Sequence, residues 1–128
     1  MIAVDTNILV YSHRRDSPFH ERARLKLSEL ADGRGAWAIP WPCVHEFLAV
    51  VTHPRIYRPP TSIEVALRAV EAWLAAPNLV LLCEGPGYFA ELSRLMQIGQ
   101  ISGPRVHDAR IAALCLSQGV RELWSADR

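Results

Sequence analysis

The chain combines short unbroken apolar runs with longer stretches in which apolar residues recur every three or four positions. Short apolar runs are typical of buried strands. They predict four strands, at residues 2–5, 36–40, 79–82 and 122–125. Turn-forming stretches, among them "ADGRG" and "THPRIYRPPTS", punctuate the sequence between these elements.

The longer stretches predict five helices. Four of these helices are predicted at residues 18–30, 63–74, 88–96 and 106–118, and a fifth begins at "WP" and ends at "HP". The helix at 63–74 lies between a "TS" cap and Pro77. The last of the five, at 106–118, is apolar on almost every side up to Gly119, which predicts a helix packed into the interior.

Strands that alternate with helices of this length predict an α/β fold, in which helices cover both faces of a parallel sheet. In such sheets ligands bind beyond the carboxyl ends of the strands. The first predicted strand ends on Asp5. This carboxylate is therefore expected at the edge of the sheet where ligands bind.

At 128 residues, half of them hydrophobic, the sequence has the size of one compact domain spanning residues 1–128. It lacks both a run of about eighteen apolar residues and a basic leader, so we expect a cytoplasmic protein without a membrane segment. The net charge of +1 does not indicate a polyanionic partner. Cys43, Cys83 and Cys115 are odd in number and show no CxxC spacing, so we expect reduced core residues rather than disulfides or a zinc site.

Three further carboxylates are expected near Asp5. Glu46 lies in the helix after the second strand, Asp108 in the first turn of the last helix, and Asp127 just after the last strand. In a parallel sheet these segments would converge on one rim. Short polar residues at the same edge, able to hold a carboxylate or a metal-bound water by hydrogen bonds, are Thr6, Asn7 and Ser125. The equally favoured alternative is that they are only turn and capping residues.

Each carboxylate also has a structural interpretation. Asp5 suits the N-cap of a short helix, "NILVY", Asp108 complements a helix dipole, and Glu46 and Asp127 fit solvent-exposed positions. Together, however, three of them lie in the most apolar stretches of the chain, where clustered carboxylates repel unless a cation neutralises them. Oxygen donors without Cys or His spacing favour Mg²⁺ or Mn²⁺, and such sites support phosphoryl transfer or phosphodiester hydrolysis.

Four blocks of the sequence carry a resemblance to a known family. "VDTNILVY", "WPCVHEFLAVVTHPR", "HDARIAALCLSQG" and "ELWSADR" together resemble the PIN domain, and specifically the VapC-type toxins of bacterial toxin–antitoxin modules. The blocks span nearly the whole chain in the right order. "DTN" alone is a weak signal, whereas the four blocks with this spacing are a strong one.

The resemblance implies a three-layer α/β/α sandwich with a central parallel sheet of four or five strands. It implies an endoribonuclease dependent on Mg²⁺ or Mn²⁺ that hydrolyses phosphodiester bonds of tRNA, rRNA or mRNA. It also implies a homodimer and a cognate antitoxin that inserts a segment, often with an arginine, into the acidic site. The catalytic and metal-binding positions of the family correspond here to Asp5, Glu46, Asp108 and Asp127, and its accessory polar positions to Thr6, Asn7 and Ser125.

One departure concerns the C-terminus. Family members typically continue past the last motif with a Phe-containing turn and a short final strand, but this sequence stops at Arg128. We therefore expect that a C-terminal segment is missing, and we rank Asp127 below the other three carboxylates.

Recognition of RNA is predicted from basic and aromatic residues. Arg14, Arg15, Arg55 and Arg58 would contact phosphates, and Tyr57 would stack on an unpaired base. The alternative is that these residues only make the surface soluble.

Two other functions compete with the nuclease. A phosphatase of the haloacid dehalogenase type also begins with a strand that ends in Asp, but it needs a second Asp where this chain has Asn7 and a downstream Lys where this chain has only Lys26. The other is a PIN domain that binds RNA or a protein without cutting. Metal-dependent cleavage distinguishes the binding module from the enzyme.

Overall fold

A parallel sheet of four strands forms the centre of the molecule, in the order β3-β2-β1-β4. The computed structural model describes residues 1–125. The strands are β1 (Ile2–Val4), β2 (Trp37–Pro40), β3 (Leu79–Leu82) and β4 (Glu122–Trp124). Ile2 pairs with Trp37 on one side and with Glu122 on the other. All four carboxyl ends therefore lie at one edge of the sheet, as predicted.

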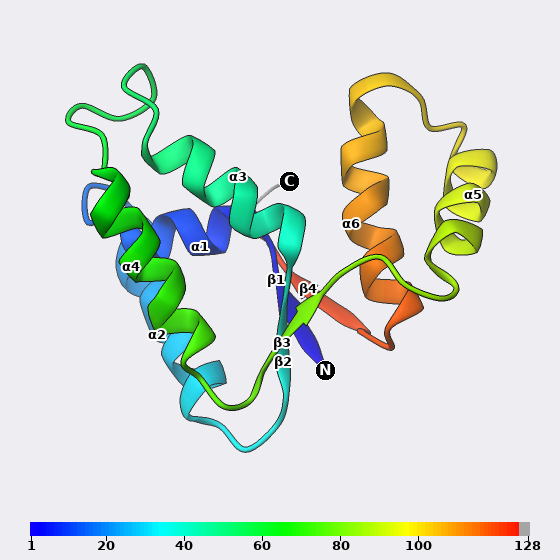
Figure 1. Cartoon of the computed structure of the whole chain (residues 1–128), viewed down its shortest axis with the longest axis horizontal. Helices are drawn as coiled ribbons and strands as arrows, with labels where there is room; N and C mark the ends of the chain where they lie inside the picture. Colours follow the sequence, from blue (N-terminus) through cyan, green and yellow to red (C-terminus); the bar gives the residue numbers. More distant parts are fainter. Residues whose placement is uncertain (126–128) are drawn as a thin grey trace.

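Helices lie on both sides of this sheet (Figure 1). On one side are α1 (Thr6–His13), α2 (His20–Asp32), α3 (Trp41–Val51) and α4 (Ile63–Leu74). On the other are α5 (Tyr88–Gly99) and α6 (Val106–Ser117), with the 3-10 turn η1 (Gly103–Arg105) between them. The predicted three-layer α/β/α arrangement is confirmed. Within residues 1–125 no helix is both long and apolar enough to cross a lipid bilayer.

The predicted elements agree closely with the observed ones. Strand β3 has the predicted bounds, and the other three strands lie within the predicted ranges. Helix α4 begins at the predicted cap, where the Ser62 side chain accepts a hydrogen bond from the Val65 amide. Helix α2 begins two residues later than expected, because a turn in which the His20 amide bonds to the Ser17 carbonyl precedes it.

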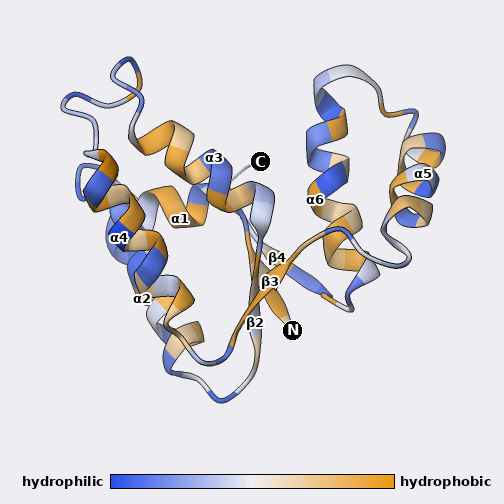
Figure 2. Cartoon of the chain, in the orientation of Figure 1, coloured by the Kyte–Doolittle hydropathy of each residue, from blue (hydrophilic) through white to orange (hydrophobic). Residues whose placement is uncertain are grey.

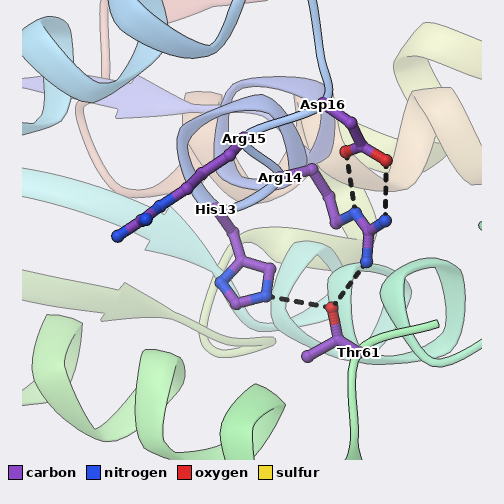
Figure 3. A pocket seen from close by; sticks show the side chains of 5 residues that line it. All are labelled: His13, Arg14, Arg15, Asp16 and Thr61. Atoms are coloured by element: carbon purple, nitrogen blue, oxygen red, sulfur yellow. Dashed lines mark hydrogen bonds and ion pairs between the residues drawn. The ribbon is translucent and has the colours of Figure 1, made fainter. Parts of the chain in front are cut away.

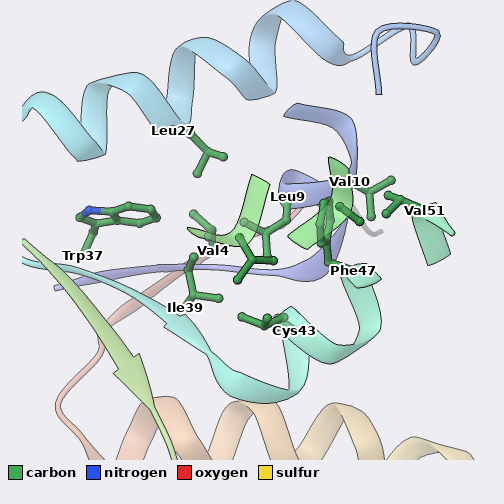
Figure 4. Close-up of a cluster of buried hydrophobic side chains, with 12 residues drawn as sticks. Val4, Leu9, Val10, Leu27, Trp37, Ile39, Cys43, Phe47 and Val51 are labelled. Carbon is green, nitrogen blue, oxygen red and sulfur yellow. The ribbon is translucent and has the colours of Figure 1, made fainter. Parts of the chain in front are cut away.

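Two apolar clusters hold the layers together. Figure 2 shows where hydrophobic residues fall along the strands and helices, and Figure 4 draws the side chains of the larger cluster. The larger packs β1 and β2 against α1, α2, α3 and α4, with Trp37 and Phe47 as its largest fully buried side chains. The smaller lies between the sheet and α6, around Leu82 and Leu114. Most of the apolar packing is therefore on the side of α1–α4.

Helix α6 differs from its prediction as an interior helix. Ala109, Ala113, Leu114 and Cys115 are buried, but Leu116 is 47% exposed. The sheet and α5 together cover only part of α6, so Leu116 remains at the surface. The helix ends at Ser117, one residue before the predicted bound, and the predicted stop at Gly119 is confirmed by its left-handed φ of 75°.

Asn78, just before β3, joins three segments of the chain. Its Nδ2 donates to the carbonyls of Leu30, Gly33 and Gly35 at 2.8, 3.1 and 3.1 Å. Its Oδ1 accepts a 3.1 Å hydrogen bond from Nε1 of the buried Trp37. One amide side chain thus fixes the connection between α2 and β2 and satisfies the indole N–H inside the core.

The C-terminal end of α1 is tied to the long loop after α3. Nε2 of His13 lies 3.1 Å from Oγ1 of Thr61, and the His13 ring meets Phe47 edge-on. Arg14 donates to both oxygens of Asp16 and to Thr61 (Figure 3). It also donates to the Pro59 carbonyl. Its guanidinium also lies 4.2 Å from the centre of the Tyr57 ring. These contacts hold the loop against α1.

We predict that Asn78→Ala destabilises the fold by about 1–3 kcal/mol, since the Trp37 indole N–H would lose its partner inside the core. Asn78→Asp is also expected to destabilise, because it would place a carboxylate against three carbonyl oxygens. Urea unfolding measures both effects. Gln97→Ala, on the exposed face of α5, is the control and is expected to stay within about 0.5 kcal/mol. Wild-type stability of Asn78→Ala would contradict the prediction.

His13 is expected to make stability depend on pH. Burial, and secondly the charges of Arg14 and His20, lower the pKa of His13 below its ordinary value of 6.5. The unfolded chain therefore binds a proton that the folded chain does not, and the free energy of unfolding should fall as the pH drops through 6.5 toward the lower folded pKa. Urea unfolding between pH 7.5 and 5 measures this. His13→Gln should flatten the dependence and the exposed His107→Gln should not; equal slopes in all three proteins would show that His13 is not responsible.

Candidate functional site

Asp5 lies where β1 ends and α1 begins. Its backbone is still extended, and its amide continues the sheet with a 2.9 Å hydrogen bond to the Trp124 carbonyl. Its side chain is the N-cap of α1, where Oδ1 accepts a 2.8 Å bond from the Thr6 amide. The capping interpretation of Asp5 is therefore confirmed, and the same residue lies at the carboxyl edge of the sheet.

Two further side chains orient the Asp5 carboxylate. Ser125, immediately after β4, donates from Oγ to Oδ2 at 3.0 Å. Cys43, in the first turn of α3, donates from Sγ to Oδ1 at 3.6 Å. The sequence predicts this kind of role for Ser125, but for Cys43 it predicts only a place in the core. The signal that would have found Cys43 is its position three residues before Glu46, on the same face of a helix.

Thr6 connects Asp5 to Glu46. The Thr6 side chain is 4% exposed, and its Oγ1 donates to Oε2 of Glu46 at 3.2 Å. Glu46 reaches this hydroxyl from the exposed side of α3. Asp5 and Glu46 are thus held at neighbouring positions by one short side chain, which places two of the predicted carboxylates together.

Asp108 does not join this pair. It is exposed in the first turn of α6. The part of α6 that lies near Asp5 is instead around Cys115, seven residues later, where the charge of Asp5 helps to raise the pKa of the thiol. Seven residues are two helical turns, so Asp108 and Cys115 share one face of α6 and lie about 10 Å apart along its axis. Within residues 1–125 no three His, Cys, Asp or Glu side chains are grouped to hold a metal ion. Asp127 lies outside the described residues.

The apolar stretches in which these carboxylates lie do not bury them. Asp5 is half-buried, but Glu46 and Asp108 are exposed. Apolar neighbours in sequence do not bury a helical residue, because successive side chains point about 100° apart around the axis. His45 shows the same effect, since it is exposed and stacks on Trp41 rather than facing the carboxylates.

The cysteines divide into two kinds. Cys43 and Cys115 are buried, as predicted, but Cys83 is exposed at the end of β3, so its assignment to the core is wrong. The apolar run of β3 ends at Leu82, and Cys83 falls outside the covered part of the sheet. Burial raises the pKa of Cys43 to about 12 and that of Cys115 to about 11, with the charge of Asp5 adding to both. Both thiols therefore remain protonated at neutral pH.

The predicted RNA-binding arginines also differ from one another. The Arg14 side chain is 11% exposed and engaged with Asp16, Thr61 and Tyr57. It lines a shallow pocket with His13, Arg15, Asp16 and Thr61 (Figure 3). Arg15, Arg55 and Arg58 are exposed, and their side chains make no ion pair with the described part of the chain. Contact of any of the four with RNA stays a prediction.

Asp5 and Glu46 have the donor chemistry of a Mg²⁺ or Mn²⁺ site. Both present oxygen atoms, which these hard cations prefer, and Mg²⁺ typically binds one or two carboxylates and completes its coordination with water and substrate phosphate. The donor set thus fits a divalent cation of this class.

Comparison with curated proteins finds VapC ribonucleases. The chain is 32% identical over 124 residues to ribonuclease VapC48 of Mycobacterium tuberculosis, an alignment that covers 97% of this chain and 86% of that protein. It is 36% identical over 128 residues to the VapC ribonuclease Mb2897 of Mycobacterium bovis, covering 100% of this chain and 86% of that protein.

Solved structures show the same fold. VapBC2 from Rickettsia felis, bound to a DNA fragment from its promoter, matches with a TM-score of 0.65 and 20% identity, covering 99% of this chain and 89% of that one. VapC20 of Mycobacterium tuberculosis, a toxin that cleaves the sarcin-ricin loop, matches with a TM-score of 0.67 and 13% identity, covering 99% and 90%. The family model of the PIN domain matches residues 2–128. With these relatives and a carboxylate pair at the carboxyl edge of a parallel sheet, the chain belongs to the PIN domain family.

Proposed function

We propose that the protein is a metal-dependent endoribonuclease that acts as the toxin of a toxin–antitoxin module. The observation that carries the proposal is the pairing of Asp5 with Glu46 through Thr6, at the edge of the sheet where an α/β protein binds its ligand. Relatives at 32% and 36% identity that are named ribonucleases support the reaction. The toxin role is supported by the likeness to VapBC2 and VapC20.

The residues that would hold the cation are Asp5, Glu46 and Asp108, with Asp127 as a fourth. Mg²⁺ or Mn²⁺ at this position would neutralise charge on the scissile phosphate and lower the pKa of an attacking water. The two halves of the donor set come from opposite sides of the sheet, because Asp5 and Glu46 belong with α1 and α3, whereas Asp108 belongs to α6.

The chain's own contribution is orientation. The Thr6 amide and the Cys43 thiol fix Oδ1 of Asp5, and Ser125 fixes Oδ2. The Thr6 hydroxyl fixes Glu46 in the same way. Carboxylates held in advance lose less rotational freedom when a cation and a phosphate bind, which favours the bound geometry. Asn7, in the first turn of α1, is proposed as a further polar group of this edge.

Substrate binding is assigned to exposed arginines. Arg15, Arg55 and Arg58 extend from the end of α1 and from the loop after α3, and Tyr57 lies in the same loop. Arginine side chains with no internal ion pair are available to phosphate oxygens. Arg14 is proposed as a fourth RNA-binding residue, and it also holds the loop that carries Arg55, Tyr57 and Arg58.

The proposed partners follow from the same site. An antitoxin segment with an arginine would pair with the carboxylates of Asp5 and Glu46 and block access of RNA to them. We also propose that the protein acts in the cytoplasm as a homodimer, as the family resemblance implies.

We predict that the purified protein cuts RNA at discrete positions with Mg²⁺ or Mn²⁺ and that EDTA abolishes cleavage. Asp5→Asn should reduce the rate by at least about a hundredfold, because it removes a charged donor. The amide retains the capping oxygen of α1, so the variant is expected to fold. Gel analysis of total RNA with mapping of the new ends measures this.

The matched control is Asp32→Asn, an exposed carboxylate at the end of α2 that lies outside the proposed site. It should cleave like the wild type. A folded wild-type protein that cuts no RNA with either metal would overturn the enzyme and leave an RNA- or protein-binding module as the function. Equal cleavage by Asp5→Asn and wild type would place the active site elsewhere.

We predict that the double variant Arg55→Ala/Arg58→Ala binds single-stranded RNA more weakly in an Asp5→Asn background. The dependence of log affinity on log salt should become shallower by about 0.7 for each phosphate that the variant no longer binds. Arg24→Ala, which removes the partner of Glu21 on α2, is the control. Fluorescence anisotropy at several salt concentrations measures the slope, and an unchanged slope would exclude both arginines from the RNA interface.

A further inference from the structure

The hydrogen bonds to Asp5 divide its two oxygens into different roles. Oδ1 accepts from the Thr6 amide at 2.8 Å and from the Cys43 thiol at 3.6 Å. Oδ2 accepts from the Ser125 hydroxyl at 3.0 Å. A carboxylate has about four acceptor positions, two on each oxygen. Within the described residues Oδ1 is therefore saturated, and Oδ2 retains one acceptor position.

Cys43 reaches Asp5 from a rigid position. Its side chain is fully buried in the larger apolar cluster, beside the end of β2 (Figure 4). It lies one turn before Glu46 on α3. The same face of α3 thus makes two bonds to the β1–α1 junction, from Cys43 to Asp5 and from Thr6 to Glu46. Two bonds between the same pair of segments restrict the rotation of α3 relative to the β1–α1 junction more than either bond would alone.

We propose that Cys43 is a positioning residue, whose thiol holds Oδ1 of Asp5 and so directs the remaining acceptor position of Oδ2 toward a divalent cation. This inference rests on the proposed function, because it concerns the same carboxylate. It assigns a role to a residue for which the sequence predicts only a place in the core. The thiol itself does not coordinate the cation.

Cys115 provides a matched comparison. It is a second buried thiol, it lies near Asp5 from the opposite side of the sheet, and it makes no hydrogen bond to Asp5 in the described structure. Replacing it removes the same atoms from the interior. An effect caused only by loss of a buried sulfur near Asp5 would therefore appear at both positions, whereas positioning requires an effect at Cys43 alone.

The test measures Mn²⁺ binding to the RNA-free protein by electron paramagnetic resonance, which detects the free ion. Cys43→Ala should weaken Mn²⁺ binding about tenfold, the size expected when a group that orients a metal ligand is lost. Cys43→Ser should restore most of the affinity, since a hydroxyl also donates to Oδ1. Cys115→Ala should bind like the wild type. Circular dichroism and thermal unfolding establish that each variant folds, and Cys43→Val replaces Cys43→Ala if the smaller side chain prevents folding.

Wild-type Mn²⁺ affinity in a folded Cys43→Ala or Cys43→Val would overturn the proposal. So would equal weakening in Cys43→Ser, or in Cys115→Ala, because either result shows a packing effect. Asp5→Asn separates the two proposals. If Asp5→Asn abolishes Mn²⁺ binding while Cys43→Ala leaves the Mn²⁺ affinity unchanged, only the positioning role of Cys43 fails. If Asp5→Asn binds Mn²⁺ like the wild type, the metal site at Asp5 fails, and the positioning role of Cys43 fails with it.

Discussion

The hydrogen bond from the Thr6 amide to Oδ1 of Asp5 marks the point at which strand becomes helix. The first amides of a helix lack partners within it, and an aspartate at the N-cap supplies one. Here the same residue is joined to β4 through its own amide. Asp5 therefore helps to set the direction in which α1 leaves the sheet, and with it the position of Thr6, which bonds to Glu46.

This double use explains why a structural and a functional interpretation of Asp5 are compatible. The cap occupies one oxygen, and the second oxygen remains at the carboxyl edge with only Ser125 bonded to it in the described residues. Asparagine can retain the cap but lacks the charge. The contribution of Asp5 to folding can therefore be separated from its contribution to cleavage. Asp5→Asn tests the charge without removing the helix cap, which removal of the whole side chain would also take away.

The layers of the fold divide the proposed site between two apolar clusters. Asp5 and Glu46 belong to segments that the larger cluster holds together, since this cluster packs α1 and α3 against the sheet. Asp108 stands on α6, which the smaller cluster anchors near Leu114 and Cys115, two turns from Asp108. The packing of α6 on the sheet therefore sets how far Asp108 lies from the other two carboxylates.

The sequence by itself determined the order of strands and helices, the parallel sheet and the placing of Asp5 at its carboxyl edge, because apolar periodicity and turn residues act over short stretches. It also indicated Thr6 and Ser125 as neighbours of Asp5, since residues just beyond parallel strands share an edge. Only the tertiary structure decided that Cys43 contacts Asp5 while Cys83 is exposed, and that Glu46 joins Asp5 while Asp108 stays apart. Those outcomes depend on which face of each helix the sheet covers and on the angle between the helix and the sheet. The packing of segments that are distant in the sequence determines this face and this angle, so a local sequence pattern does not predict them.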